Sequence, residues 1–428
     1  MAAITSRRKR FNPDWEKDFY RNGYPAEVIV INSPTPPPTP STNKHALSSS
    51  KRKTPTTKKR RKDNVADSKP NQPVVASYDD KDGHYVIVPD EDLTPRYRII
   101  RQLGQGTFGK VVECWDKVAR SFVAIKIIRA VQKYRDASKI EIRVLNTIAK
   151  HDPRNLNKCI HLRETFDFRN HVCMVFDLFG QSVFDFLKEN HFCPFPPRQI
   201  QHFAKQLLQS VAFLHDLELI HTDLKPENIL LVNGEYKVVP SKTKAPNKRV
   251  LLDTNIRLID FGSATFNSEY HSSVVSTRHY RAPEIILGMG WSFPCDIWSI
   301  GCILVEFSTG DALFQTHDNL EHLAMMETVL GRISDRMMRN ANCASQKYFK
   351  HGRLDYPNQE TNRQSRKYVK AMKPLAEIIP PRNKINALLL DLLKQLLVYD
   401  PDERISAREA LEHPYFFTDP GPEEDDET

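Results

Sequence analysis

The sequence lacks the features that would point to a membrane or secreted protein. No apolar run reaches the roughly 18 to 20 residues that a helix needs to cross a bilayer. Residues 1–10 are polar and basic, without the apolar core of a secretion signal. The seven cysteines form no Cys-x-x-Cys pair, which argues against a zinc module and a disulfide framework. We therefore expect a soluble intracellular protein with reduced thiols.

Most of the chain also lacks net positive charge, although the whole sequence carries +9 at pH 7. Residues 1–70 contain sixteen Lys and Arg against six Asp and Glu, whereas the remaining residues contain 46 and 47. The basicity therefore belongs to an N-terminal arm. A domain without net basic charge is a poor candidate for a nucleic-acid-binding surface.

Residues 1–92 contain few apolar residues and cannot bury enough surface to offset the entropy of ordering. We predict that this arm is disordered. Its basic blocks 7–10, 51–53 and 58–62 are typical of nuclear-import signals, and the alternative is a solvated arm without a receptor. The Pro-rich run 33–40 is a polyproline ligand, a set of phosphorylation sites or a stiff spacer.

Dense apolar periodicity begins at Tyr97 and predicts a small sheet with one amphipathic helix. The expected strands are 97–103, 110–114 and 122–128, and the expected helix is 138–150.

After a further expected strand at 171–178 the chain becomes mainly helical, and residues 296–307 are apolar almost all round, as in a buried helix. The sequence therefore predicts an α+β fold of two lobes. The β-rich lobe covers residues 97–178 and the mainly α lobe covers 179–417. An acidic, solvated tail follows at 418–428.

A glycine-rich segment, Gly104–Gly109, has the form G-x-G-x-x-G. A dinucleotide-binding turn needs a helix after the third glycine, but residues 110–114 have strand composition, so the glycines lie at a hairpin tip. A P-loop is excluded because Val111 stands where Ser or Thr must bind magnesium. Glycines at such a tip let backbone amides approach the phosphates of ATP. The predicted ATP-binding residues here are Leu103, Gly104, Gln105, Gly106, Thr107, Phe108, Gly109, Lys110 and Val111.

The stretch His221–Asn228 places an acid, a lysine and an amide close together, as phosphoryl transfer requires. Asp223 can accept a proton from a hydroxyl nucleophile, Lys225 can steady the phosphoryl charge, and Asn228 can hold magnesium. The spacing resembles the catalytic loop of protein kinases, in which Asn follows five residues after Asp. Thr222 departs from that pattern because it replaces an arginine.

Two further charged side chains and an Asp-Phe-Gly tripeptide extend this set. Lys126 ends the stretch Val-Ala-Ile-Lys, which resembles the third-strand lysine of protein kinases. Glu141 lies inside the expected helix and is the candidate partner of Lys126 at the ATP phosphates; a solvated helix face is the alternative. Asp260 begins the tripeptide and is predicted to hold the second magnesium position.

These five polar anchors stand in one order ahead of residues 282–284, Ala-Pro-Glu. Residues 97–417 therefore resemble a eukaryotic protein kinase domain. The stretches 277–281, 296–302 and 400–401 are similar to those of the CMGC group, the branch that contains the cyclin-dependent and MAP kinases.

Within that branch, residues 321–328 read Glu-His-Leu-Ala-Met-Met-Glu-Thr, nearly the signature of the LAMMER, or CDC-like, kinases. Thr328 stands where the signature has arginine. The stretch has the spacing of a helix that buries Leu323, Met326 and Leu330, and we expect packing to be its main physical role.

Two other features fit the same family. Residues 239–255 stand where these kinases resemble one another in having a hairpin insert, which either guides substrates or is a solvated excursion. Thr222 is the family's own departure from arginine. An arginine there clamps a phosphate on the activation segment, and threonine cannot. We therefore hypothesise that residues 260–284 adopt the productive conformation without an obligatory phosphate.

The resemblance implies a dual-specificity protein kinase that uses ATP and Mg²⁺. Thr277 occupies the position of the threonine that, in Ser/Thr kinases, bonds the catalytic aspartate and lysine, so transfer to Ser and Thr is expected. Tyrosine autophosphorylation is a further family trait. Adenine is expected to bind the backbone near Asp177 and Phe179, with Phe176 at the back of the pocket or simply in the core.

The resemblance also implies Arg/Ser-rich splicing factors as substrates. With the basic arm, which offers a site for a nuclear import receptor, it leads us to expect a monomer in the nucleus and also in the cytoplasm, without membrane association. One alternative is a catalytically weak scaffold, a pseudokinase, but its mark would be a missing anchor and all five are present. Another is nucleic-acid binding by residues 1–92 alone.

Overall fold

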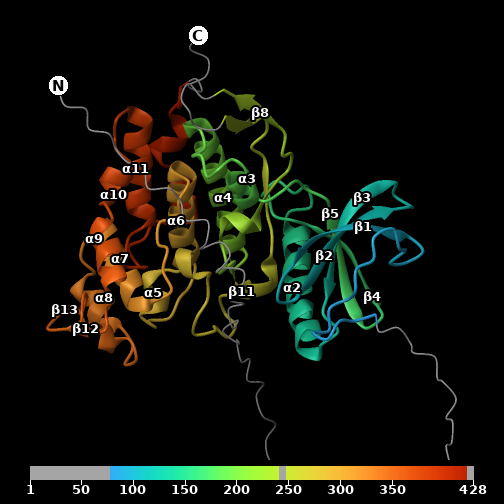
Figure 1. Ribbon diagram of the computed structural model, residues 1–428, viewed down its shortest axis with the longest axis horizontal. Coiled ribbons are helices and arrows are strands. Elements are labelled where there is room, and N and C mark those ends of the chain that lie inside the picture. The colour runs from blue at the N-terminus through green and yellow to red at the C-terminus, as the bar shows by residue number, and fades with distance from the viewer. Residues whose placement is uncertain (1–77, 241–246, 422–428) are drawn as a thin grey trace, which may run out of the picture. The chain divides into compact units, whose positions relative to one another are not determined.

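The computed structural model describes residues 78–240 and 247–421 (Figure 1). Residues 1–77, with the import blocks and the Pro-rich run, lie outside the described residues, so the disorder predicted for them is not tested. Residues 422–428 of the tail also lie outside. Contacts group the described residues, from Tyr78 onward, into one compact unit. No helix in the described part of the chain has the length and apolar character of a membrane span.

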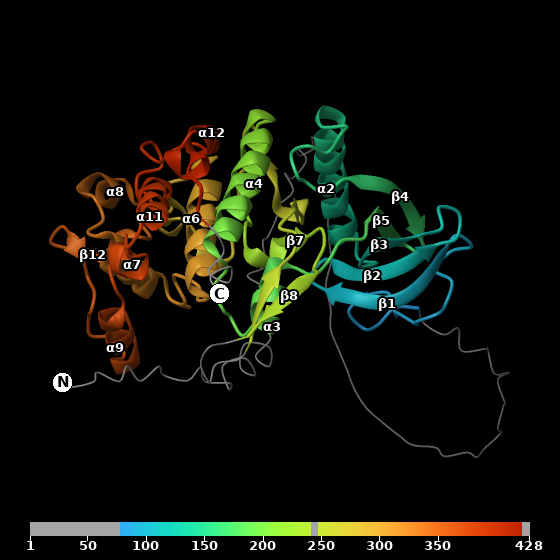
Figure 2. The ribbon, with the colours of Figure 1, turned by 90° about the horizontal axis from the view of Figure 1, so that it is seen from above.

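The N-terminal lobe is a five-stranded antiparallel sheet, ordered β1-β2-β3-β5-β4, with one long helix against it (Figures 1 and 2). Along β3, Val123, Ile125 and Ile127 are buried on one face, which leaves Lys126 on the other, towards α2. The elements are β1 (Tyr97–Gln105), β2 (Gly109–Asp116), β3 (Ser121–Ile128), α2 (Gln132–His151), β4 (Leu162–Phe168) and β5 (His171–Asp177). The predicted small sheet with one helix is confirmed.

The segment 78–92 corrects the predicted extent of the disordered arm. It is ordered and packs on the sheet face opposite α2, where Tyr85 is only 3% exposed. The Tyr85 ring meets the ring of His171 edge to face, and His171 Nε2 lies 2.8 Å from Asp79 Oδ1. The apolar side chains of this segment are few, but they cover a face of the sheet that would otherwise be exposed. The prediction that residues 78–92 are disordered is therefore wrong.

The C-terminal lobe is mainly helical, as predicted (Figure 2). Helix α6 is buried on all sides, including Trp298, and has little amphipathic character. Leu323 and Met326 of α7 are fully buried and Leu330 is partly buried, as predicted. The helices are α3 (Val183–Glu189), α4 (Pro197–Asp216), α5 (Pro283–Ile286), α6 (Pro294–Thr309), α7 (Asn319–Leu330), α8 (Asp335–Asn340), α9 (Arg363–Ala371), α10 (Leu375–Ile378), α11 (Lys384–Leu396) and α12 (Ala407–Leu411).

Short strand pairs position the loops of the C-terminal lobe. Antiparallel pairs β7–β10 and β6–β11 bring the loop after Ile220 beside the loop that contains Asp260. The predicted insert, residues 239–255, forms part of an antiparallel hairpin of β8 and β9 that begins earlier, at Tyr236, and residues 241–246 lie outside the described chain. The strands are β6 (Leu219–Ile220), β7 (Ile229–Leu231), β8 (Tyr236–Val239), β9 (Lys248–Leu251), β10 (Ile256–Leu258), β11 (Thr265–Phe266), β12 (Phe349–Lys350) and β13 (Arg353–Leu354).

Candidate active site

Lys126 joins the two lobes through two carboxylates. Its Nζ lies 2.7 Å from Glu141 Oε1 on α2 and 3.5 Å from Asp260 Oδ1 after β10. Burial alone would lower the pKa of Lys126, but the charges of Glu141 and Asp260 outweigh it and raise that pKa above its ordinary value. The lysine is therefore a fixed cation, and the solvated-face alternative for Glu141 does not apply, since that residue is buried.

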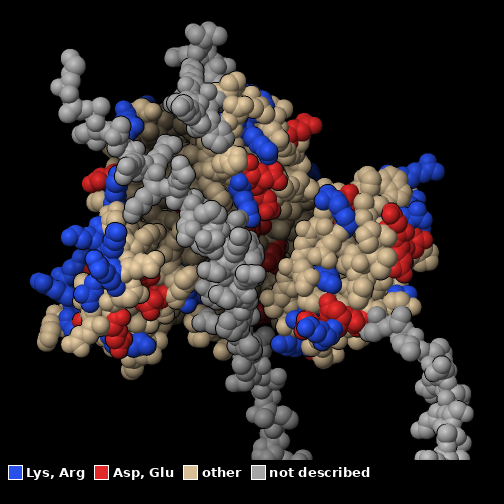
Figure 3. All heavy atoms as spheres, viewed as in Figure 1, with Lys and Arg blue, Asp and Glu red and all other residues tan. Residues whose placement is uncertain are grey.

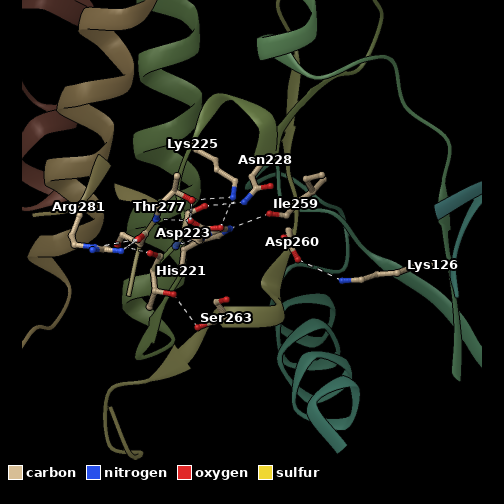
Figure 4. A network of polar contacts seen from close by, with 12 residues as sticks. Lys126, His221, Asp223, Lys225, Asn228, Ile259, Asp260, Ser263, Thr277 and Arg281 are labelled. Carbon is tan, nitrogen blue, oxygen red and sulfur yellow. Dashed lines mark hydrogen bonds and ion pairs between the residues drawn. The ribbon is translucent and has the colours of Figure 1, made fainter. Parts of the chain in front are cut away.

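Asp223, Lys225 and Thr277 form one closed network (Figure 4). The Thr277 backbone N–H and Oγ1 both donate to Asp223 Oδ1, at 2.9 and 2.7 Å. Lys225 Nζ donates to Asp223 Oδ2 at 2.7 Å and to Thr277 Oγ1 at 3.1 Å. Burial disfavours the Lys225 charge, but Asp223 more than offsets it and raises the lysine pKa. The Asp223 side chain is thus held in one orientation.

Asn228 and Asp260 lie on adjacent loops because the backbone N–H of Ile259 donates to the Asn228 carbonyl at 3.0 Å. The Asn228 side-chain amide donates to the Asp223 carbonyl at 2.9 Å, which fixes the amide and leaves its oxygen as an acceptor. Burial would raise the pKa of Asp260, but Lys126, His221 and Lys225 lower it below its usual range. An amide oxygen and a carboxylate are ligand types that Mg²⁺ prefers, so the residues present fit that ion.

Thr222 joins a chain of hydroxyl–carbonyl bonds that sequence reasoning missed. Its Oγ1 donates to the Ser263 carbonyl at 2.9 Å, and its own carbonyl accepts from Ser276 Oγ at 2.6 Å. Arg281 Nη2 then donates to the Ser276 carbonyl at 2.9 Å. Thr222 and Ser276 both adopt positive φ, at 69° and 68°, a cost that the surrounding bonds must offset. Serines are too common for the sequence to single out Ser263 or Ser276.

Buried Asp296 of α6 anchors the backbone of the catalytic loop. Its two carboxylate oxygens accept the N–H groups of His221 and Thr222, both at 2.9 Å. The sequence marked residues 296–302 as a family feature but gave no sign of this contact, because the two partners are distant in sequence. The loop therefore rests on the central helix of the C-terminal lobe.

The glycine-rich hairpin is closed by the Gly106 N–H, which donates to the Gly109 carbonyl at 2.9 Å. A Cβ at Gly109 would stand 2.2 Å from the Ile127 carbonyl oxygen, so only glycine fits there. Open space surrounds Gly104 and Gly106, where backbone can meet a ligand. The side chain of Lys110 does not join the five anchors, because its Nζ donates to the Tyr85 carbonyl at 3.0 Å.

The remaining predicted ATP-binding residues belong to the glycine-rich hairpin or to the connection between the lobes. Asp177 ends β5 and its carboxylate lies 3.3 Å from Arg163 Nη1. Phe179 is partly buried against the core, and the Arg257 guanidinium lies over its ring. Phe176 is buried. The residues at the hairpin are Leu103, Gln105, Thr107, Phe108 and Val111, of which Leu103 is exposed and Phe108 packs partly against the core.

Comparisons with known proteins agree with this geometry. A family model described as the protein kinase domain matches residues 97–416. The dual specificity protein kinase lkh1 of Schizosaccharomyces pombe is 56% identical over 81% of this chain and 50% of its own length, so the chain spans half of that relative. The serine/threonine-protein kinase AFC2 of Arabidopsis thaliana is 50% identical over 79% of this chain and 81% of its own length. A crystal structure of another kinase domain, 35% identical, covers 79% of this chain and all of its own, with a TM-score of 0.74.

Proposed function

This chain belongs to the protein kinase family, among the LAMMER (CDC-like) dual-specificity kinases, and we propose that its physiological substrates are Arg/Ser-rich RNA-processing proteins. Transfer of the γ-phosphoryl of ATP to Ser and Thr hydroxyls is the activity of the domain. The observation that carries the mechanism is the network of Asp223, Lys225 and Thr277. No anchor is missing, so the pseudokinase alternative has no support.

We assign the proton acceptor to Asp223. Two donors from Thr277 hold Oδ1, so the carboxylate cannot rotate away from an incoming hydroxyl. The Lys225 ammonium, bonded to both residues, supplies positive charge where the transferred phosphoryl passes. Since charge and position are fixed before substrate binds, little reorganisation is needed during transfer.

ATP would bind between the glycine-rich hairpin and the Lys126–Glu141 pair, with the Lys126 ammonium against the phosphates. Asn228 and Asp260 would hold Mg²⁺, which supplies electrostatic stabilisation of the phosphate charge. Asp260 adopts φ 63°, a left-handed conformation that directs this residue into the site at a backbone cost. The adenine would bind backbone groups near Asp177 and Phe179.

The activation segment is proposed to be productive without phosphorylation. Thr222 offers no guanidinium for a phosphate. Neutral hydroxyl bonds instead join Thr222 of the catalytic loop to Ser263 and Ser276 of the segment. Arg281 completes the arrangement from within the segment. These bonds do in an unmodified chain what a phosphate clamp does elsewhere.

The Arg/Ser-rich substrate class is supported by the family and by Glu227. This side chain is exposed two residues after Lys225 and can pair with a substrate guanidinium. A nuclear location, with residence in the cytoplasm as well, is proposed from the basic arm, and a monomer is the simplest assembly.

A peptide array phosphorylated by the purified chain with ATP and Mg²⁺ tests the substrate proposal. We expect Ser peptides flanked by Arg to be phosphorylated well above matched peptides in which Arg is replaced by Glu. Glu227→Gln should lower kcat/KM on the Arg-flanked peptides several-fold. It should leave kcat/KM on control peptides flanked by Ala unchanged. Equal labelling of both peptide sets would refute the proposed substrate class without refuting the kinase activity.

A further inference from the structure

A groove of about 550 Å³ lies on the C-terminal lobe between α4 and the segment Leu251–Asn255. None of the five anchors of the active site lines it. Its walls are largely the polar face of α4 and the backbone that leaves the insert hairpin. It is therefore a second concave surface, outside the chemistry described above.

The groove is lined by an excess of positive charge. Arg198, His202 and Lys205 recur on α4 at the spacing that puts them on one face of a helix, and Lys158 adds a further ammonium. Lys158 and Lys205 have no acidic side-chain partner among residues 78–240 and 247–421. Asp253 is the acid among the lining residues, and its Oδ1 already accepts from the Asn255 backbone and side-chain amide.

The side-chain oxygen of Gln199 accepts no hydrogen bond within the described chain. The side chain is 2% exposed, and its Nε2 donates to the Leu251 carbonyl at 3.0 Å. Its Oε1 is buried without a hydrogen-bond partner in the described chain. A buried acceptor left unpaired is unfavourable, so the groove favours a ligand that brings an N–H group. The first turn of α4 contains no acid and no side-chain cap, which also favours a negative ligand.

The described chain ends beside this groove. Arg198 Nη2 donates to Asp419 Oδ1 at 2.8 Å and to the Gly421 carbonyl at 3.1 Å. The sequence then continues with Pro422 and five consecutive acids, Glu423–Glu427. From Arg198 to Lys205 the helix rises only about 10 Å. Six extended residues span about 20 Å, so the acids can extend from Arg198 past Lys205, and Lys158 lines the same groove.

We propose that the acidic segment Glu423–Glu427 docks in this groove. Its carboxylates pair with Lys158, Arg198 and Lys205, and a backbone N–H donates to Gln199 Oε1. The segment thereby occupies a site for acidic peptides in the same molecule. A tether this short gives an effective concentration of about 1 mM, enough to compete with a free acidic peptide.

The test measures binding of a fluorescent peptide with the sequence of residues 421–428 to two full-length chains at low salt. One chain is unmodified, and the other has its acids neutralised (E423Q, E424Q, D425N, D426N and E427Q). If the free peptide binds the neutralised chain with a Kd of about 0.1 mM, the docked tail should make its binding to the unmodified chain about tenfold weaker. Adding Lys158→Glu and Lys205→Glu to the neutralised chain should abolish binding.

A second basic surface provides the control. Figure 3 shows Lys and Arg gathered over α9 and the β12–β13 region, and Lys367 and Lys370 of α9 are exposed. Lys367→Glu with Lys370→Glu should leave peptide binding to the neutralised chain unchanged. Equal affinity in the unmodified and neutralised chains would overturn the proposal, as would failure of the neutralised chain to bind. Loss of binding through the α9 variants instead of the groove variants would overturn it as well.

Discussion

Thr277 Oγ1 lies 2.7 Å from Asp223 Oδ1, and the Thr277 backbone N–H bonds the same oxygen. The activation segment thus orients the Asp223 side chain directly, so a residue 54 positions away sets the geometry of the proposed proton acceptor. Lys225 bonds to both residues and makes the arrangement a triangle. Substrate orientation and activation-segment conformation are therefore one structural property.

Replacing Thr277 tests this relationship. A hydrogen bond to a charged group is worth about 1.5–3 kcal/mol, so Thr277→Ala should lower kcat about tenfold to a hundredfold with little change in the KM for ATP. Thr277→Ser keeps the hydroxyl and should recover most of the rate. If Ala and Ser variants have the same kcat, the hydroxyl does not position Asp223.

Independence from phosphorylation is tested by phosphatase treatment. The purified chain, freed of phosphate and assayed on a peptide in the first minute after ATP addition, should keep its rate. Ser276→Ala should reduce that rate several-fold, since it removes the bond to the Thr222 carbonyl, whereas Ser273→Ala, at an exposed position, should not. Loss of peptide phosphorylation after phosphatase would contradict the hydroxyl-bond account.

The ordered segment before β1 should contribute to stability. Tyr85 is almost fully buried on the sheet, and truncating a large buried aromatic costs about 3–5 kcal/mol. Tyr85→Ala should therefore lower the free energy of unfolding in denaturant by about 3 kcal/mol. Val86→Ala changes an exposed neighbour and should have little effect. Equal stability of the two variants would show that the segment does not pack as described.

Glu306 gives a pH-dependent prediction. Burial raises the pKa of this residue to about 8, from an ordinary 4.5, and Tyr280 donates to it at 2.7 Å. Between pH 4.5 and 8 the unfolded chain releases this proton while the folded chain keeps it, so stability falls by up to about 1.4 kcal/mol per pH unit. Glu306→Gln lacks this loss and should gain relative stability as the pH rises through that window. A pH-independent difference between variant and unmodified chain would refute it.

Local patterns predicted the two lobes, the strands around the glycines and the five anchors, because periodicity and spacing act over short stretches. The helix α2 starts at Gln132 rather than at the expected residue 138. The sequence did not indicate its first turns because they carry little apolar periodicity. The sequence could not predict contacts between residues that are far apart in the chain and of common types. Ser276 with Thr222, and Tyr85 with His171, are recognisable only after folding brings them together.

The central claim is that Asp223 receives the proton during phosphoryl transfer, and Asp223→Asn tests it most directly. General-base catalysis contributes about 10² to 10⁴ in rate, so the variant should lose at least a hundredfold in kcat for peptide phosphorylation. Its affinity for ATP, for which we propose the Lys126–Glu141 pair as a binding group, should change little. Full phosphotransfer by the Asp223→Asn chain would contradict the account.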